Sequence, residues 1–419
     1  MRRTVLIAFL AFLAIPMQAR PAAHLQDHWV ASWFTSQMSY EPQSALPSEA
    51  LTDSTLRQAV RISLGGKVLR LRLSNEFGAA PLHLLGVHIA KAQPGGAIDP
   101  ASDRALTFDG SAEVVIPAGA SYLSDAVAYP VEPFADLAIS IHYGQPPQRQ
   151  TGHPGSRTTS YYAPGDHLSA VLLPEAKTVD SWYQIASIEV QAPHKTSAVV
   201  VLGDSITDGR GSTTNGNNRW TDMLARHLAE GRVSIGVLNA GIGGNRLLND
   251  GTGPNTLARF NRDVLAAPGV KTLIVLEGVN DLGTLTVEHP VPVEEHEALV
   301  KRMIAAYKQL AARAHAHGLK AYIATVMPFM GFDYYHPDAQ NDADRTAVNA
   351  WIRTQTEFDG VIDFDKLTAD PAEPDQLLPA YDVGDKIHPS PEGYRVMGKA
   401  AAAFLLHTRE QAGHNHSRR

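Results

Sequence analysis

The sequence predicts a chain of two units, a β-sandwich or jelly-roll-like region followed by a three-layer α/β/α domain. Residues 24–195 contain short segments with alternating apolar side chains, broken by Gly and Pro, and no long helical pattern. Several short strands at this spacing favour an all-β unit. From Ser197 onward, apolar strand-like runs alternate with helical segments, which is typical of a parallel sheet covered by helices on both faces. The length of 419 residues accommodates two or three domains at about 150 residues each.

The strands of the first unit are predicted from period-two patterns. Residues 56–64 and 69–73 alternate between apolar and polar side chains, with Gly65 and Gly66 between them. We expect a hairpin here, with one face buried and the other solvated. Further short strands are expected at residues 84–90, 113–116, 137–142 and 181–190.

Apolar runs that alternate with helical patterns predict the second unit. Strands are expected at residues 197–202, 233–238, 271–276, 320–326 and 360–365, and helices at residues 219–230, 293–317, 344–356 and 391–406. Residues 191–196, with Pro193, are interpreted as the linker, so the two domains are predicted as residues 24–195 and 196–410. The polar residues 411–419 are expected to form a disordered tail.

The N-terminus has the pattern of an export signal. Two arginines precede an apolar run at residues 5–15, and small residues follow up to Ala23, which is the order found in secretory signal peptides. The run is too short to span a bilayer of about 30 Å as a helix, and no integral membrane association is expected. Residues 1–23 are therefore predicted to be a signal peptide, and the protein to be secreted or periplasmic.

Composition excludes several classes of protein. The chain contains no Cys and has a formal net charge of −7; loss of residues 1–23, which carry three arginines and no acid, would make the charge more negative. A nucleic-acid partner is not expected, because it would require a basic face. The lack of Cys excludes a thiol nucleophile and Cys-ligated metals. Phosphate-loop and His-Glu-x-x-His motifs are also absent, and we expect no metal or organic cofactor.

Four groups of reactive side chains lie where a parallel sheet places its ligand site, at the carboxyl ends of strands. They are Gly203-Asp204-Ser205, residues 239–245, residues 278–281, and Asp385-Lys386-Ile387-His388 before the last helix. Each group alone is compatible with an ordinary turn or a helix cap. Together they supply a serine nucleophile, donors for an oxyanion, a histidine base and an aspartate that orients it. Asp382 is the competing orienter.

This ordered set resembles the GDSL, or SGNH, hydrolase superfamily over Ser197 to about Leu406. The matching blocks are Gly203-Asp204-Ser205, Gly244, Asn280 and Asp385-x-x-His388, with Ile206 in place of the family's leucine. The resemblance implies a flavodoxin-like α/β/α fold. The absence of Gly-x-Ser-x-Gly disfavours the α/β-hydrolase fold.

The resemblance also implies the role of each site residue. Ser205 would attack an ester carbonyl, His388 would take the Ser205 proton, and Asp385 would orient His388. The backbone N–H groups of Ser205 and Gly244, with the Asn280 side chain, would form the oxyanion hole. Gly243 is the alternative glycine.

Three further residues are expected on the substrate side of the site. Arg246 lies beside the oxyanion loop and is expected to contact substrate oxygen or a carboxylate. Asn245 is assigned to the same group, although holding the neighbouring loops is its other interpretation. Phe329 begins the aromatic segment 329–336, which is interpreted either as the lining of an acyl or alcohol pocket or as a packed surface loop.

These residues predict a secreted serine esterase that acts through an acyl-enzyme on a small-molecule or polysaccharide ester. The upstream segment 74–78, Ser-Asn-Glu-Phe-Gly, is similar to family members that carry an N-terminal β domain, some of them linked to plant polysaccharide breakdown. The resemblance therefore favours short acyl groups, such as acetyl, on carbohydrate. A broad-specificity arylesterase or lipase is the alternative. A carbohydrate-binding surface protein, in which the β region does the work, is a third hypothesis.

Overall fold

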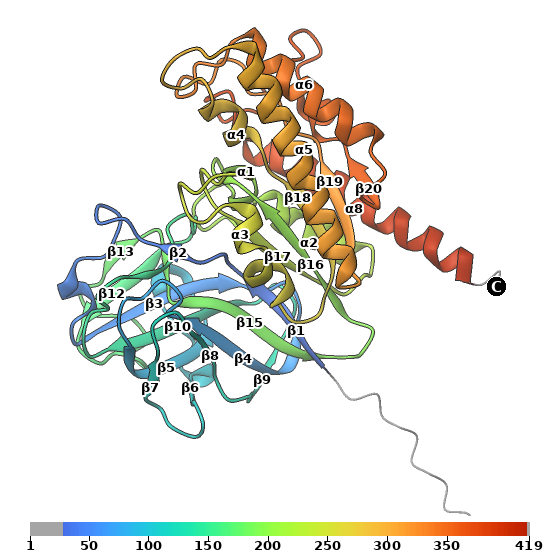
Figure 1. The fold of residues 1–419 in the computed structure, drawn as a ribbon. Coiled ribbons are helices and arrows are strands. Elements are labelled where there is room, and N and C mark those ends of the chain that lie inside the picture. The colour runs from blue at the N-terminus through green and yellow to red at the C-terminus, as the bar shows by residue number, and fades with distance from the viewer. Residues whose placement is uncertain (1–27, 417–419) are drawn as a thin grey trace, which may run out of the picture.

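The computed structural model describes residues 28–416, in which an antiparallel β region is followed by an α/β domain that lies against it (Figure 1). Within these residues no helix is long and apolar enough to cross a membrane. The export signal expected at residues 1–23 lies outside the described residues.

Two large antiparallel sheets and one small sheet form the β region. The larger has the strand order β13-β12-β3-β10-β5-β6, with β7 on β5; the second has the order β1-β15-β4-β8, with β9 on β4; the small sheet is β14-β11-β2. The strands are β1 (His28–Phe34), β2 (Met38–Ser39), β3 (Ser54–Arg61), β4 (Gly66–Ser74), β5 (Leu82–Lys91), β6 (Arg104–Leu106), β7 (Val114–Ile116), β8 (Ser121–Leu123), β9 (Val127–Val131), β10 (Asp136–Tyr143), β11 (Thr151–His153), β12 (Ser160–Pro164), β13 (Lys177–Val179), β14 (Trp182–Tyr183) and β15 (Ile185–Ala192).

The prediction of a hairpin over residues 56–73 is wrong. Both strands exist, but β3 pairs with β10 and β12, whereas β4 pairs with β15 in the other sheet. The connecting residues bond to other segments, since Ile62 N donates to Ala135 O at 3.1 Å and Ser63 N to Ser32 O at 2.8 Å. The apolar faces of both strands belong to one buried core, so the chain crosses between sheets here instead of turning back within one.

The α/β domain is built on five parallel strands in the order β17-β16-β18-β19-β20. In chain order this is 2-1-3-4-5, the doubly wound flavodoxin-like arrangement. The strands are β16 (Ser197–Gly203), β17 (Ile235–Gly241), β18 (Val270–Leu276), β19 (Lys320–Ala324) and β20 (Gly360–Ile362). The parallel sheet and the α/β class confirm the corresponding part of the sequence prediction.

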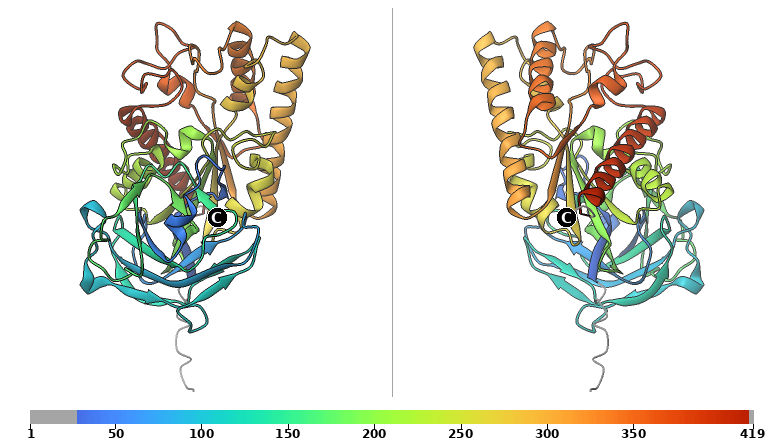
Figure 2. Two further views of the ribbon diagram at one scale, coloured as in Figure 1. Left: turned by 90° about the vertical axis from the view of Figure 1, so that its left-hand side faces the viewer. Right: turned by 90° about the vertical axis from the view of Figure 1, so that its right-hand side faces the viewer.

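Helices cover both faces of this sheet. They are α1 (Ser205–Asp208), α2 (Trp220–Glu230), α3 (Thr256–Phe260), the π-helical turn η4 (Asn261–Leu265), α4 (Val279–Thr284), α5 (Val293–Ala316), α6 (Ala339–Thr354), α7 (Phe364–Thr368) and α8 (Pro391–His416). The pair α2 and α8 packs on one face and the pair α5 and α6 on the other, as the two side views in Figure 2 show. A sheet covered in this way buries its central strands on both faces, which is why their sequences are continuous apolar runs.

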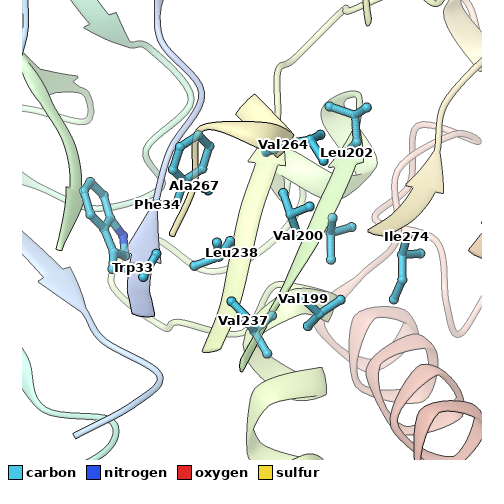
Figure 3. Packing of buried hydrophobic residues seen from close by; sticks show 14 of the residues in the cluster. Trp33, Phe34, Val199, Val200, Leu202, Val237, Leu238, Val264, Ala267 and Ile274 are labelled. Atoms are coloured by element: carbon cyan, nitrogen blue, oxygen red, sulfur yellow. The ribbon is translucent and has the colours of Figure 1, made fainter. Parts of the chain in front are cut away.

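The β region and the α/β domain share one apolar core. Val200 on β16 and Leu238 on β17 are fully buried, and Trp33 and Phe34 of β1 lie beside β17 in the same cluster (Figure 3). A Cβ at Gly236 would lie 2.3 Å from Ala31 O, so glycine at this position allows β1 to approach β17 closely. The two units are thus continuous through their interior.

Helix α8 extends to His416. The prediction of a disordered tail at residues 411–419 is therefore wrong for residues 411–416. The sequence here contains no Pro, and Gln411 bonds to the His407 ring one turn earlier at 2.7 Å. Such i, i+4 pairs stabilise the last turns of an exposed helix. Polarity alone therefore did not predict where the helix ends.

Candidate active site

The serine lies at the first position of α1, directly after β16. Asp204 caps this helix, since its Oδ1 accepts a hydrogen bond from Ile206 N at 2.9 Å. A Cβ on Gly203 would lie 2.3 Å from Thr207 Oγ1, so glycine is required where the strand turns into the helix. Ser205 is nearly buried, and its Oγ lies 2.9 Å from His388 Nε2. Its backbone N–H is in the first turn of the helix, where no intrahelical acceptor exists.

Asp385 holds the opposite edge of the histidine ring. His388 Nδ1 lies 2.6 Å from Asp385 Oδ2, and His388 N donates to Asp385 Oδ1 at 2.9 Å. Burial raises the pKa of Asp385, but the hydrogen bonds from the side chain and backbone of His388 lower it more, to about 2. A carboxylate that accepts at Nδ1 keeps a hydrogen there and leaves Nε2 as the acceptor that faces Ser205.

Asp382, the competing orienter, has a different set of partners. Its Oδ1 accepts hydrogen bonds from Gly384 N at 2.8 Å and Lys386 N at 3.1 Å, and its Oδ2 lies 3.9 Å from Lys386 Nζ. Asp382 therefore shapes the loop that carries Asp385, and the ring nitrogen of His388 faces Asp385.

Gly244 and Asn280 line the same cavity as Ser205. Gly244 has φ +75°, a left-handed conformation that favours glycine. The Asn280 amide is held from both sides, because Nδ2 donates to Asn245 O at 2.7 Å and Oδ1 accepts from Tyr335 Oη at 2.6 Å. One Nδ2 hydrogen remains to donate to another acceptor. Gly243 lines the cavity as well, so both candidate glycines are near the serine.

Three buried acids near the serine, Asp204, Glu277 and Asp281, interact electrostatically with one another. Burial raises the pKa of Asp204 to about 7 and the pKa of Asp281 to about 6. Burial, reinforced by neighbouring carboxylates, raises the pKa of Glu277 well above its usual range. Glu277 Oε2 lies 3.7 Å from Arg259 Nη2, and neither Glu277 oxygen has a hydrogen-bond partner among the described residues. None of these three acids is among the residues that line the cavity.

The three residues expected on the substrate side do not line the cavity. Arg246 turns back to the carbonyl of Asp250. Asn245 is buried and ties loops together, with Nδ2 donating to Thr252 O at 3.0 Å. Phe329 is fully buried in the core. The structure thus places all three side chains away from the cavity lining, and Asn245 fits its other interpretation, that it holds the neighbouring loops. Closeness in sequence to Gly244 or to a strand end does not fix the direction of a side chain in an irregular loop.

The cavity has a volume of about 590 Å³ and receives residues from both units. Its aromatic wall comes from the segment singled out in the sequence, but from Phe332, Tyr334 and Tyr335 instead of Phe329. Tyr334 is 66% exposed, so its ring is accessible from solvent. The remaining lining residues of the α/β domain are Ser205, Asp208, Arg210, Gly243, Gly244, Thr252, Asn280, Asp333, Ile387 and His388.

The β region contributes a wall that sequence reasoning missed. Met38, His153, Pro154, Gly155 and Arg157 line the cavity. These residues lie far from the serine in sequence and belong to no recognisable motif. No pattern in the sequence therefore indicated that they would line the cavity.

A direct bond links this wall to the helix that carries the serine. His153 Nε2 lies 2.8 Å from Asp208 Oδ1, at the last position of α1, and both side chains are buried. A Cβ at Gly155 would lie 2.1 Å from Asp208 Oδ2, so the loop after β11 wraps closely around this carboxylate. The β region therefore helps to hold α1 in place.

No group of three or more metal-ligating side chains occurs among residues 28–416. The chemistry that these residues allow is nucleophilic: a serine hydroxyl in contact with a histidine that is itself bound to a carboxylate, beside backbone and amide donors.

Comparisons with known proteins give several solved structures to which about half of this chain is similar. Solved structures with similar folds include a lipase/acylhydrolase from Enterococcus faecalis at 21% identity, which covers 50% of this chain and 95% of that one with a TM-score of 0.37. Est24, a carbohydrate acetylesterase from Sinorhizobium meliloti, has 17% identity, covers 51% and 99%, and has a TM-score of 0.38. An aryl esterase from M. smegmatis has 15% identity, covers 50% and 98%, and has a TM-score of 0.39. No functionally curated protein shows significant sequence similarity to the chain.

The family model described as the GDSL-like Lipase/Acylhydrolase family matches residues 201–396. This segment begins inside β16 and ends inside α8, and it contains the serine, the glycines, the asparagine and the histidine described above. Residues 201–396 of this chain are thus a GDSL-like lipase/acylhydrolase domain, and the protein is an ester hydrolase.

Proposed function

We propose that this ester hydrolase is an exported serine esterase that removes short acyl groups, such as acetyl, from carbohydrate. The observation that carries the catalytic assignment is the continuous chain of contacts from Ser205 Oγ to His388 Nε2 at 2.9 Å and from His388 Nδ1 to Asp385 Oδ2 at 2.6 Å.

In the first half-reaction Ser205 forms the acyl-enzyme. Ser205 Oγ attacks the ester carbonyl carbon while His388 Nε2 takes the hydroxyl proton, and Asp385 stabilises the imidazolium that results. The tetrahedral oxyanion accepts hydrogen bonds from Ser205 N, Gly244 N and Asn280 Nδ2. The intermediate collapses with loss of the alcohol, which takes the proton from His388.

In the second half-reaction water releases the acid. His388 Nε2 removes a proton from water as the water oxygen attacks the acyl carbon, and the same donors bind the second oxyanion. Ser205 leaves with the proton from His388. In the overall reaction, one ester and one water give one acid and one alcohol, and no step uses a metal or an organic cofactor.

The side chains that line the cavity support a substrate whose alcohol portion is polar. Arg157, Arg210 and Asp333 line it together with the rings of Phe332 and Tyr334. An exposed ring next to polar side chains suits a sugar, which offers apolar C–H faces and hydroxyl groups. Est24, the carbohydrate acetylesterase among the similar solved structures, prompts the proposal that the acyl group is short, such as acetyl. Export is proposed from the signal pattern of residues 1–23, and cell fractionation of the full chain tests it.

The catalytic assignment is tested by turnover of p-nitrophenyl acetate. We expect Ser205→Ala to remove turnover, since it deletes the attacking oxygen. Ser234→Ala is the matched control, because Ser234 is exposed in the loop before β17, at the opposite end of the sheet. Equal rates in wild type and Ser205→Ala would contradict the mechanism.

Acyl length and alcohol class need separate measurements. A series of p-nitrophenyl esters from acetyl to palmitoyl distinguishes the short-acyl esterase from a broad-specificity arylesterase or lipase. Release of acetate from acetylated polysaccharides tests the carbohydrate assignment. A rate that increases toward long acyl chains would favour the lipase.

A further inference from the structure

The loop that follows β11 brings one cation from the β region to a fixed position at the active-site cavity. Arg157 lines the cavity that also contains Ser205 and His388. The Arg157 carbonyl accepts a hydrogen bond from Asn215 N at 2.9 Å. The carbonyl of the preceding residue, Ser156, accepts a hydrogen bond from the Arg219 guanidinium. Residues of the α/β domain thus hold the loop at Ser156 and at Arg157 itself.

The nearest acid to Arg157 is already neutralised. His153 Nδ1 lies 2.9 Å from the carbonyl of Ser36 and must carry a hydrogen, because a carbonyl accepts and cannot donate. The 2.8 Å contact between His153 Nε2 and Asp208 Oδ1 needs a second proton on one of these two atoms. Whichever atom carries it, the His153–Asp208 pair has no net charge.

Arg157 therefore keeps a charge that no acid balances. Its Nη2 lies 3.8 Å from Asp208 Oδ2, which is beyond hydrogen-bond distance. Its Nε is buried with no hydrogen-bond partner among the described residues. The side chain is 32% exposed, so its outer edge is accessible to a ligand in the cavity.

Arg210 adds a second cation, and Asp333 is the remaining acid of the lining. Neither forms an ion pair with another residue of the part of the chain that the structure describes, and both are exposed. Asp333 comes from the aromatic wall, in the segment between Phe332 and Tyr334. Apart from the triad and the neutral His153–Asp208 pair, the charges of the cavity sum to a positive value.

We propose that the substrate carries a carboxylate close to the scissile ester and that Arg157 binds this carboxylate. An O-acylated uronic-acid unit of an oligosaccharide has this chemistry, because its carboxylate and its esterified hydroxyl are on one sugar ring. The guanidinium would form charge-assisted hydrogen bonds to the carboxylate. Arg157 is then a specificity-determining residue supplied by the β region. This inference rests on the proposed esterase function and narrows its substrate class.

The test compares a charged substrate with its neutral counterpart. An O-acetylated methyl glycoside of a hexuronic acid is paired with the corresponding uronamide, which has the same shape and no charge, and released acetate is measured. We expect wild type to prefer the uronate in kcat/KM by roughly tenfold, the size of one partly exposed charge-assisted contact. Added salt should reduce the preference.

Variants assign the preference to one residue. Arg157→Gln should bring the ratio of the two kcat/KM values close to one, and Arg157→Lys should restore part of the ratio. Arg302→Gln is the matched control, since Arg302 is exposed on α5 and does not line the cavity; it should change nothing.

The outcomes separate this inference from the proposed function. A wild-type enzyme that hydrolyses p-nitrophenyl acetate but shows no preference for the uronate, or hydrolyses neither sugar, overturns the carboxylate assignment alone. A preference that survives Arg157→Gln but disappears in Arg210→Gln overturns the choice of Arg157. A wild-type enzyme without activity on any of the three esters overturns the proposed function itself.

Discussion

Tyr335 donates a hydrogen bond from its hydroxyl to Asn280 Oδ1 at 2.6 Å. This bond assigns the two ends of the Asn280 amide, because the oxygen is occupied by the tyrosine and the nitrogen must face the other way. The second contact, from Asn280 Nδ2 to Asn245 O at 2.7 Å, fixes the same orientation. The amide is thus preorganised before any substrate binds, as electrostatic stabilisation of an oxyanion requires.

We expect Tyr335→Phe to lower kcat by about tenfold while KM changes little, because the loss concerns a group that acts in the transition state. The ring is retained, so the packing against Gly283 is preserved. Steady-state kinetics with p-nitrophenyl acetate measures the effect. Tyr334→Phe is the control, since Tyr334 is exposed and lies in the same segment. Equal losses in both variants would contradict a role through Asn280.

Asp385→Asn should lower kcat by about 10⁴-fold, because an amide at this position favours the wrong histidine tautomer. Asp382→Asn should cost less than tenfold, since its amide oxygen can still accept the bonds from Gly384 N and Lys386 N. The comparison of the two variants tests which aspartate orients His388. A larger loss from the change at Asp382 would reverse the assignment.

The buried acids predict a pH dependence of stability. Because burial raises the pKa of Glu277, the folded state holds a proton that the unfolded chain releases at about pH 4.3, the ordinary pKa of Glu. Stability is therefore full below that pH and is lost as pH rises through the raised pKa. The raised values for Asp281, about 6, and Asp204, about 7, act in the same direction.

Glu277→Gln should therefore weaken the dependence of the unfolding free energy on pH. Urea unfolding at pH 5 and pH 8 measures it, with a smaller decline in the variant than in wild type. The exposed Glu297 on α5 supplies the control Glu297→Gln. An unchanged slope in Glu277→Gln would show that this carboxyl is ionised in the fold.

His153→Gln should destabilise the protein by about 3 kcal/mol, because it leaves the buried Asp208 carboxylate without its partner. The double variant His153→Gln/Asp208→Asn should recover part of this loss, since it removes the unpaired charge as well. Chemical denaturation of the four members of the cycle gives the coupling energy. Additive effects would show that the two side chains do not interact.

The sequence predicted the α/β domain well for identifiable physical reasons. Val199 to Leu202 read as a buried strand because both faces of β16 are covered, and the strand-end rule then pointed to Ser205. The alternation of apolar and polar residues also identified β3 and β4 correctly as strands. A period of two shows which face of a strand is buried, but it does not show which strand pairs with it, so the sequence did not predict that β3 and β4 belong to different sheets. Strand β20 ends at Ile362 because Asp363 caps α7, a local bond that apolar runs do not show.

The walls of the cavity were harder to predict than its catalytic centre. Phe329 and Tyr335 belong to one aromatic segment without a period, and three-dimensional packing decides that the first enters the core and the second faces Asn280. Arg246 lies two residues after Gly244, yet its side chain bonds to Asp250 within its own loop. His153 reaches Asp208 across 55 positions of sequence, and no local pattern reports such a contact.

The close approach of β1 to β17 at Gly236 has a consequence for how the molecule comes apart. Trp33 and Phe34 belong to the same apolar cluster as Leu238 and Val264 (Figure 3). The boundary near residue 195 therefore separates two units of the sequence that share one core, and we expect them to unfold together. Heating should produce one calorimetric transition, with esterase activity lost in that same transition. We expect a fragment that begins at Ser197 to precipitate, because it would expose apolar side chains that β1 covers in the whole protein.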